Sequence, residues 1–284
     1  MIKRLFAVIL CASMLTLCAC AGEKDKESST PKTDYPAKAL DISLDSCPQK
    51  VVSLVPEITD IIIALGSDAQ LAGISDNCVD VRELGRFGDA FAPDISAIKE
   101  LEPDLVFVSA VTSENDIELL RNAGIPVAAA DGAVHYTDLR QLYIDVATLM
   151  SGNITGVRNA TNTFNNIDAK LKEISNSAGT ETTAVIFAAD GVTVPPDCFT
   201  AELTKFAGIS LISADTDSDI VAANPQVIIC PSELVGTLSA RFGNISVAEF
   251  EIAMLDRRGA DMVASVNALK SAVEQAANQS NPTY

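Results

Sequence analysis

Apolar residues in this chain fall into short β-branched runs that alternate with stretches of helical spacing. From residue 50 the runs "KVVSLV", "QLAGIS", "DLVFVS" and "PVAAA" predict strands. Between them, "ITDIIIALG", "DISAIKEL" and "ENDIELLRNAGIP" have apolar residues on one helical face. Such alternation is typical of α/β units around a parallel sheet, so residues 48–135 are predicted to form an amino-terminal α/β lobe.

A segment with helical spacing and no strand pattern follows this lobe. It contains "TDLRQLYIDVATLMSG" and "NITGVRNATNTFNNIDAKLKEI". At about 1.5 Å per residue, a helix from Thr155 to Ile174 would span about 30 Å, the width of a small domain. We therefore expect residues 136–178 to form a helical connector.

The α/β alternation then restarts, and residues 179–284 are predicted to form a carboxyl-terminal α/β lobe. The runs "TTAVIFAA", "ISLIS" and "NPQVIICPS" predict strands, and "CFTAELTKFAG" and "GADMVASVNALKSAVEQAA" predict helices. "NPQVIICPS" echoes "EPDLVFVS" of the first lobe, which indicates an internal duplication. The predicted fold class is α/β, with two Rossmann-like lobes of parallel sheet joined by a long connecting helix.

The amino terminus has the pattern of an export signal. "MIKRLFAVILCASMLTLCAC" combines two cationic residues, an apolar stretch and small residues around Cys20. Its end, Leu17-Cys18-Ala19-Cys20, resembles a bacterial lipobox, which predicts a lipoprotein signal peptide over 1–19 and a lipid on the Cys20 sulfur. An ordinary secretory leader is the alternative. Residues 20–47 are largely polar and charged, so we expect a flexible tether that holds the body at the extracytoplasmic face of the cell membrane.

Charge and cysteine content narrow the range of partners. The chain has 38 acidic and 20 basic residues, a net charge of −18, which repels phosphate backbones and argues against nucleic acid as a partner. Cysteines beyond the tether's anchor are Cys47, Cys78, Cys198 and Cys230. In an exported protein these four can form disulfides in three connectivities, or they can be isolated thiols. Both possibilities stay open.

Catalytic and metal-binding patterns are scarce. His135 is the only histidine, which excludes a His-rich zinc or manganese site. The sequence has no G-x-S-x-G elbow, phosphate loop, G-x-G-x-x-G turn or C-x-x-C pair. Carboxylates are plentiful, but no pair is distinguished by its spacing. We therefore expect a binding protein that is not an enzyme and has no cofactor of its own.

The stretch "VVSLVPEITDIIIALGSDAQLAGISDNC" and the later "GRFGDAFAPDISAIKELEPDLVFVS" carry a family resemblance. They resemble the first lobe of the helical-backbone substrate-binding lipoproteins of ABC importers, the group that takes up cobalamin, ferric siderophores and haem. The resemblance covers residues 48–175 well and residues 181–278 more weakly. It implies a monomeric ligand-capture subunit that loads a metal chelate between its lobes and delivers it to an ABC permease.

The resemblance also implies roles for single residues. Those expected to face the ligand are Pro56, Glu57, Asn77, Phe87, Phe91 and Phe199. In this family, an acid on the helix after the first strand of each lobe pairs with permease arginines, and these acids correspond to Asp60 and Glu202. An acid in a helix's first turn is stabilised by the helix dipole and stays ionised for an incoming arginine.

Three alternatives remain beside this interpretation. A haem binder of the same fold would use His135, Tyr136 or a methionine as its axial ligand. A surface sensor or adhesin would keep the fold without transport. A hydrolase would need a hidden site, for which Glu57 is the residue to test.

Overall fold

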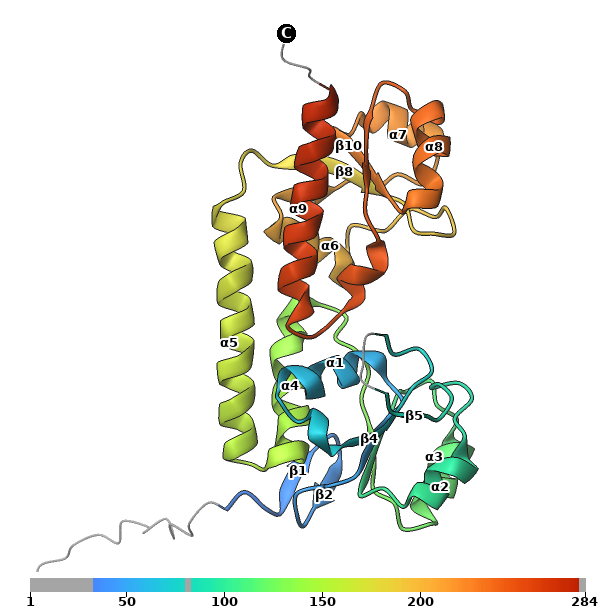
Figure 1. Cartoon of the computed structure of the whole chain (residues 1–284), viewed down its shortest axis with the longest axis vertical. Coiled ribbons are helices and arrows are strands. Elements are labelled where there is room, and N and C mark those ends of the chain that lie inside the picture. Colours follow the sequence, from blue (N-terminus) through green and yellow to red (C-terminus); the bar gives the residue numbers. More distant parts are fainter. Residues whose placement is uncertain (1–32, 80–82, 281–284) are drawn as a thin grey trace, which may run out of the picture. The chain divides into compact units, whose positions relative to one another are not determined.

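The computed structural model describes residues 33–79 and 83–280 (Figure 1). The predicted signal peptide, Cys20 and the first part of the tether lie outside the described residues. Within the described ranges, no helix is both long enough and apolar enough to cross a membrane.

The first lobe is built on a parallel sheet with the strand order β5-β4-β3-β6-β7. Its strands are β3 (Val51–Ser53), β4 (Leu71–Ile74), β5 (Gly85–Arg86), β6 (Leu105–Val108) and β7 (Val127–Ala129). Its helices are α1 (Pro56–Ala64), η1 (Asp68–Gln70), α2 (Ile95–Leu101) and α3 (Glu114–Arg121). Every residue of β3 and β6 is buried, as expected for parallel strands covered on both faces.

Two helices, α4 (Tyr136–Ser151) and α5 (Thr155–Asn176), form the connector and pack against each other. Gly156 permits this close approach, because a Cβ at that position would lie 2.1 Å from the Ala147 carbonyl oxygen. The long helix predicted from Thr155 is confirmed, and α5 also contacts the closing helix α9 (Asp261–Ser280).

The second lobe has a parallel sheet with the order β11-β10-β8-β9. Its strands are β8 (Thr182–Ile186), β9 (Ile209–Leu211), β10 (Val227–Cys230) and β11 (Ser246–Glu249). Its other helices are α6 (Phe199–Phe206), α7 (Asp217–Ala223), α8 (Ser232–Arg241) and η2 (Ile252–Asp256). The predicted fold class, α/β with parallel sheets in two lobes, is confirmed.

The internal duplication is visible in the backbone. Gly66 and Gly208, with φ of +70° and +75°, end α1 and α6 in the same left-handed conformation. Glu102 and Asn224, with φ of +50° and +46°, end α2 and α7 alike. The matching strand order and matching helix ends make the two lobes copies of one plan.

Residues 33–47 are structured, so the prediction of a flexible tether up to residue 47 is wrong. The strands β1 (Ala37–Ala39) and β2 (Ile42–Leu44) pair antiparallel, and β1 packs on α4. Asp34 accepts backbone N–H bonds from Ile154 at 3.0 Å and from Thr155 at 2.7 Å, at the start of α5. The polar composition of this segment concealed two short strands, in which Ala37 and Leu44 are buried.

The four cysteines of the body are free thiols. Cys78 and Cys230 are buried, whereas Cys47 and Cys198 are half-buried. Of the two possibilities left open by the sequence, isolated thiols are the one observed.

Candidate functional site

The carboxyl ends of the strands in each lobe point to the place where a ligand can bind. Because each sheet is parallel, all of its strands end at one edge, and α1 and α6 are the first helices after β3 and β8. Asp60 of α1 contacts Arg257 of the second lobe, and Glu202 of α6 contacts His135 at the end of the first lobe. Open α/β sheets bind ligands outside the carboxyl ends of their strands. The candidate site is therefore formed by the loops at these two edges.

Four of the loops that the structure describes in full each expose a large apolar side chain. Phe91 follows β5, Val111 follows β6, Val134 follows β7, and Val192 follows β8 in the second lobe. Their exposed fractions range from 53% to 74%. Single exposed apolar residues are ordinary on a surface, but their recurrence in four loops at the carboxyl edges indicates an apolar lining for a ligand.

Sequence reasoning identified Phe91 and missed the three valines. Each valine stands beside small or turn-forming residues, in "SAVTS", "DGAVH" and "DGVTV". A valine just beyond a strand looks like the end of the buried run, so its exposure is not readable from the pattern. The available signal was its position after a strand and next to turn residues.

Four of the predicted ligand residues lie at the carboxyl edge of the first lobe. Pro56 is the first residue of α1, and half-buried Glu57 lies against Gly132, where an added Cβ would come within 2.9 Å of the Glu57 Cγ. Asn77 and Phe91 are exposed in the loops after β4 and β5. Their roles toward a ligand stay predictions, but the fold brings them to one edge.

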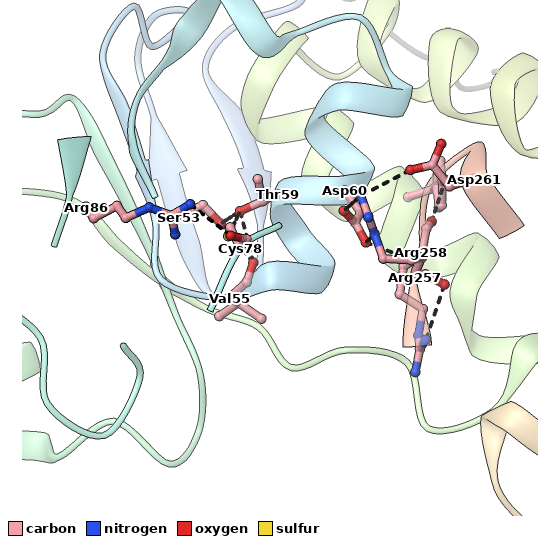
Figure 2. Close-up of polar contacts among 10 residues, drawn as sticks. Ser53, Val55, Thr59, Asp60, Cys78, Arg86, Arg257, Arg258 and Asp261 are labelled. Atoms are coloured by element: carbon pink, nitrogen blue, oxygen red, sulfur yellow. Dashed lines mark hydrogen bonds and ion pairs between the residues drawn. The ribbon is translucent and has the colours of Figure 1, made fainter. Parts of the chain in front are cut away.

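The loop that carries Asn77 is fixed by hydrogen bonds to its backbone carbonyl oxygens. Arg86 donates from its guanidinium to the carbonyl oxygens of Ser75 at 3.0 Å and Cys78 at 3.0 Å. Further inside, the Cys78 thiol donates to the Thr59 hydroxyl at 3.4 Å, and that hydroxyl donates to Ser53 Oγ at 2.9 Å (Figure 2). Sequence reasoning missed Arg86, because no pattern marks an arginine that binds carbonyl oxygens.

A second set of bonds links the loops that carry Val111 and Val134. Asp131 accepts from the Ser109 hydroxyl at 2.5 Å and from the Ala110 backbone N–H at 2.9 Å. These bonds fix the loop after β6 to the loop after β7. Asp131 therefore positions two of the exposed apolar side chains.

The other two predicted aromatic residues contact the protein itself. The Phe87 ring rests on Gly73 and Gly85, where an added Cβ would come within 2.4 Å and 2.7 Å of the ring. Phe199 is 4% exposed, and the Arg258 guanidinium lies 3.5 Å from the centre of its ring. Neither ring is presented to solvent as Phe91 is, so their ligand roles stay predictions without support from exposure.

Asp60 does not have the surroundings that were predicted for it. It is the fifth residue of α1, beyond the first turn, and is 8% exposed. Arg257 donates from Nε to Oδ2 at 2.9 Å and from Nη2 to Oδ1 at 2.8 Å, as Figure 2 shows. The premise of a first-turn acid free to receive an outside arginine is therefore wrong for Asp60, although permease docking itself stays a prediction.

Glu202 lies in the first turn of α6, as predicted, but its carboxylate also has partners within the chain. Its Oε1 is 3.0 Å from His135 Nδ1, and its Oε2 accepts the Tyr136 backbone N–H at 2.5 Å. The Tyr136 hydroxyl donates to Asp168 at 3.1 Å, and burial together with Asp168 raises the pKa of Tyr136. In the described residues, no group of three or more His, Cys, Asp or Glu side chains could hold a metal ion.

Comparison with known proteins extends these observations. No protein-family model matches the chain. An uncharacterized ABC transporter substrate-binding lipoprotein of Bacillus subtilis, YvrC, is 26% identical over 251 residues, which are 78% of each chain. A cobalamin-binding protein of Halobacterium salinarum is 22% identical over 252 residues, 80% of this chain and 68% of that protein.

Solved structures share the fold at lower identity. The periplasmic vitamin B12 binding protein BtuF of Vibrio cholerae aligns with a TM-score of 0.61 and 18% identity, over 81% of this chain and 98% of that one. The periplasmic haem-binding protein BhuT aligns with a TM-score of 0.66 and 16% identity, over 82% and 100%. All four proteins are named for binding, and YvrC for substrate binding in an ABC transporter, in agreement with the prediction of a binding protein that is not an enzyme. The predicted resemblance to the substrate-binding lipoproteins of ABC importers is thereby confirmed.

Proposed function

We propose that this chain is the extracytoplasmic substrate-binding subunit of an ABC importer, and that its cargo is a metal chelate of the corrinoid or ferric siderophore class. The name of the relative from Bacillus subtilis supports the transport role, and the name of the relative from Halobacterium salinarum supports a corrinoid cargo. The observation that carries the choice of cargo is the set of exposed apolar side chains at the carboxyl edges, Phe91, Val111, Val134 and Val192.

An organic chelate suits this lining better than a bare ion does. Burying one valine or phenylalanine side chain contributes about 1.5 to 3 kcal/mol, so four such contacts offset a good part of the cost of association. Ligand sites are mostly apolar with a few polar groups that set orientation. Glu57 and Asn77 are the polar groups proposed for that role.

The chain's attachment and its partners belong to the same proposal. Its lipobox supports lipidation at Cys20, and the relative from Bacillus subtilis is itself named a lipoprotein. Docking on the permease through Asp60 and Glu202 stays a proposal with a condition. Both carboxylates have partners within the chain, so permease arginines would have to displace those partners.

Haem is the second candidate cargo, and one contact favours it. Histidines that bind metals commonly donate their second ring nitrogen to a carboxylate, which fixes the tautomer. The Nδ1 of His135 has such a partner in Glu202, and His135 is exposed next to Val134. His135 Nε2 is thus the atom that would bind the iron of a haem carried as cargo.

A thermal-shift panel tests the proposed function. The purified protein is heated with cyanocobalamin, cobinamide, haem and several ferric siderophores in separate wells. A ligand at about 100 times its dissociation constant adds about 2.7 kcal/mol of stability, which is readily measured. Stabilisation by a corrinoid or siderophore supports the proposal, whereas no shift with any compound contradicts it. A Soret band that is lost in His135→Ala would select haem.

A further inference from the structure

Asp60 and Glu202 are equivalent residues of the two lobes. Each lies on the helix that follows the first parallel strand of its lobe, six residues before the glycine that ends that helix, Gly66 or Gly208. The duplication therefore places one acid at the same point in each copy. In both copies the acid binds a segment of the opposite lobe.

The Asp60 carboxylate is buried, and both of its oxygens accept hydrogen bonds. Besides the two bonds from Arg257, its Oδ2 accepts the Arg258 backbone N–H at 3.1 Å. The backbones also approach closely, since a Cβ on Gly259 would lie 3.0 Å from the Asp60 carbonyl oxygen. A buried carboxylate is costly unless it is paired, so α1 can pack here only with the segment before α9 in place.

Arg258 extends the same contact into the connector and α6. It is 7% exposed, its carbonyl oxygen accepts the Tyr143 hydroxyl of α4 at 2.7 Å, and its guanidinium stacks on Phe199 of α6. Burial lowers the pKa of Arg258, while the neighbouring carboxylates Glu57 and Asp60 act in the opposite direction. The segment 257–259 is thus fixed to α1, α4 and α6 at once.

The Glu202 contact mirrors this one with less burial. Its partners lie where the first lobe passes into the connector: His135 is the N-cap of α4, and Tyr136 is the first residue of that helix. The His135 and Glu202 side chains are 48% and 28% exposed, against 16% and 8% for Arg257 and Asp60. The pair with His135 carries a full charge on both sides only when the imidazole is protonated.

We propose that the two acids form a reciprocal clasp that fixes the spacing of the lobes, with Asp60 as its strong half and Glu202 as its weaker, releasable half. Each acid grips the opposite lobe, so the clasp sets the distance between the two carboxyl edges. The consequence for ligand capture rests on the proposed function, but the clasp itself does not.

Hydrogen exchange of the ligand-free, full-length protein tests the clasp. The variants are Asp60→Asn and Glu202→Gln, which keep size and remove charge. The control is Asp217→Asn, which removes the exposed pair with Arg241 inside the second lobe. Because breaking a buried pair is strongly destabilising, we expect Asp60→Asn to raise exchange about tenfold or more in both 56–64 and 257–261. The control should leave both segments unchanged.

Glu202→Gln keeps the test valid if Asp60→Asn fails to fold. We expect this variant to fold, to raise exchange in 199–206 and 135–139 together, and to lower the melting temperature less than Asp60→Asn does. Exchange that rises only in the mutated helix, or stays at the wild-type level in both variants, would overturn the clasp. Since no ligand is present, a failure here is distinct from a failure of the proposed function.

Discussion

At the scale of single residues, the exposed apolar side chains at the carboxyl edges are the feature most directly tied to binding. Phe91 was expected at the ligand only because the family resemblance assigns its loop to the cleft, and the same expectation for Phe87 has no support from exposure, since its ring packs on Gly73 and Gly85. Val111, Val134 and Val192 could not be predicted, because a valine after a strand has the same pattern whether it faces the core or the solvent. The expectation that Asp60 is free for an outside arginine was wrong because its partner Arg257 is 197 residues away in the sequence, where no local pattern reveals it.

Val134→Ala is expected to weaken ligand binding about tenfold with little change in stability. The substitution removes about two methylene equivalents of buried contact, each worth about 0.8 kcal/mol in the complex. Titration calorimetry with the ligand found by thermal shift gives the dissociation constant. The matched control is Val221→Ala on α7, whose side chain is similarly exposed at 63% but lies on a helix away from the edge loops. Equal affinity in both variants would remove Val134 from the site.

The cysteines give a second prediction at this scale. Burial raises the pKa of Cys230 to about 11 and also raises that of Cys78. Because the thiolate is the reactive form, iodoacetamide at pH 8 should modify Cys47 and Cys198 in the native protein and reach the other two only after unfolding. Peptide mass spectrometry reads the sites. Equal labelling of Cys230 and Cys198, or a native mass lower by a disulfide, would contradict the free buried thiols.

At the scale of elements, the strands and helices with strong hydrophobic periodicity were predicted correctly, whereas short or polar elements were missed. The strands from "KVVSLV" to "NPQVIICPS" and the helices around them lie where their apolar patterns place them. β5 has only two residues, and α7 and α8 each bury one side chain, Ile220 and Leu238. Elements that bury so little surface are stabilised mainly by packing against neighbouring elements, and their sequences show only a weak hydrophobic pattern.

The hairpin at residues 37–44 leads to a prediction about Asp34. Its carboxylate accepts the first N–H groups of α5, and the bonds with Thr155 lower its pKa below 3.8. Asp34→Ala should therefore lower the unfolding midpoint at neutral pH. Because the native pKa is the lower one, the deficit is largest above pH 3.8 and shrinks as the pH falls through the native pKa. Thermal unfolding across pH measures it, with exposed Asp45→Ala as the control, and a deficit that grows in acid would contradict the assignment.

At the scale of the whole molecule, the duplication explains both the fold and the way the two lobes meet. Sequence reasoning detected the repeat through "EPDLVFVS" and "NPQVIICPS", and the matching helix ends bear it out. It then read the two equivalent acids as paired contacts with a permease. A single sequence cannot reveal that Asp60 and Glu202 already have partners, because those partners come from distant parts of the chain. The duplication could therefore be predicted from the sequence, but the contacts that its two equivalent acids make with the opposite lobe could not.

Attachment to the membrane is a prediction for the full chain. Cys20→Ser removes the sulfur that the lipobox would present for lipidation, so the variant should leave the membrane fraction with its body intact. Cys18→Ser is the matched control and should stay membrane-bound. Fractionation and intact-mass analysis of both variants decide the matter. A Cys20→Ser protein that still sediments with membranes would contradict the lipid anchor.

If one ligand is held by the carboxyl edges of both lobes, hydrogen exchange with and without that ligand will show protection at both edges. The panel of corrinoids, ferric siderophores and haem supplies the compound that stabilises the protein. We predict protection in the loops 89–93, 109–112 and 131–135 of the first lobe and, in the same sample, in 190–194 of the second. Protection confined to one lobe, or located away from these loops, would show that the ligand is not held between the two carboxyl edges.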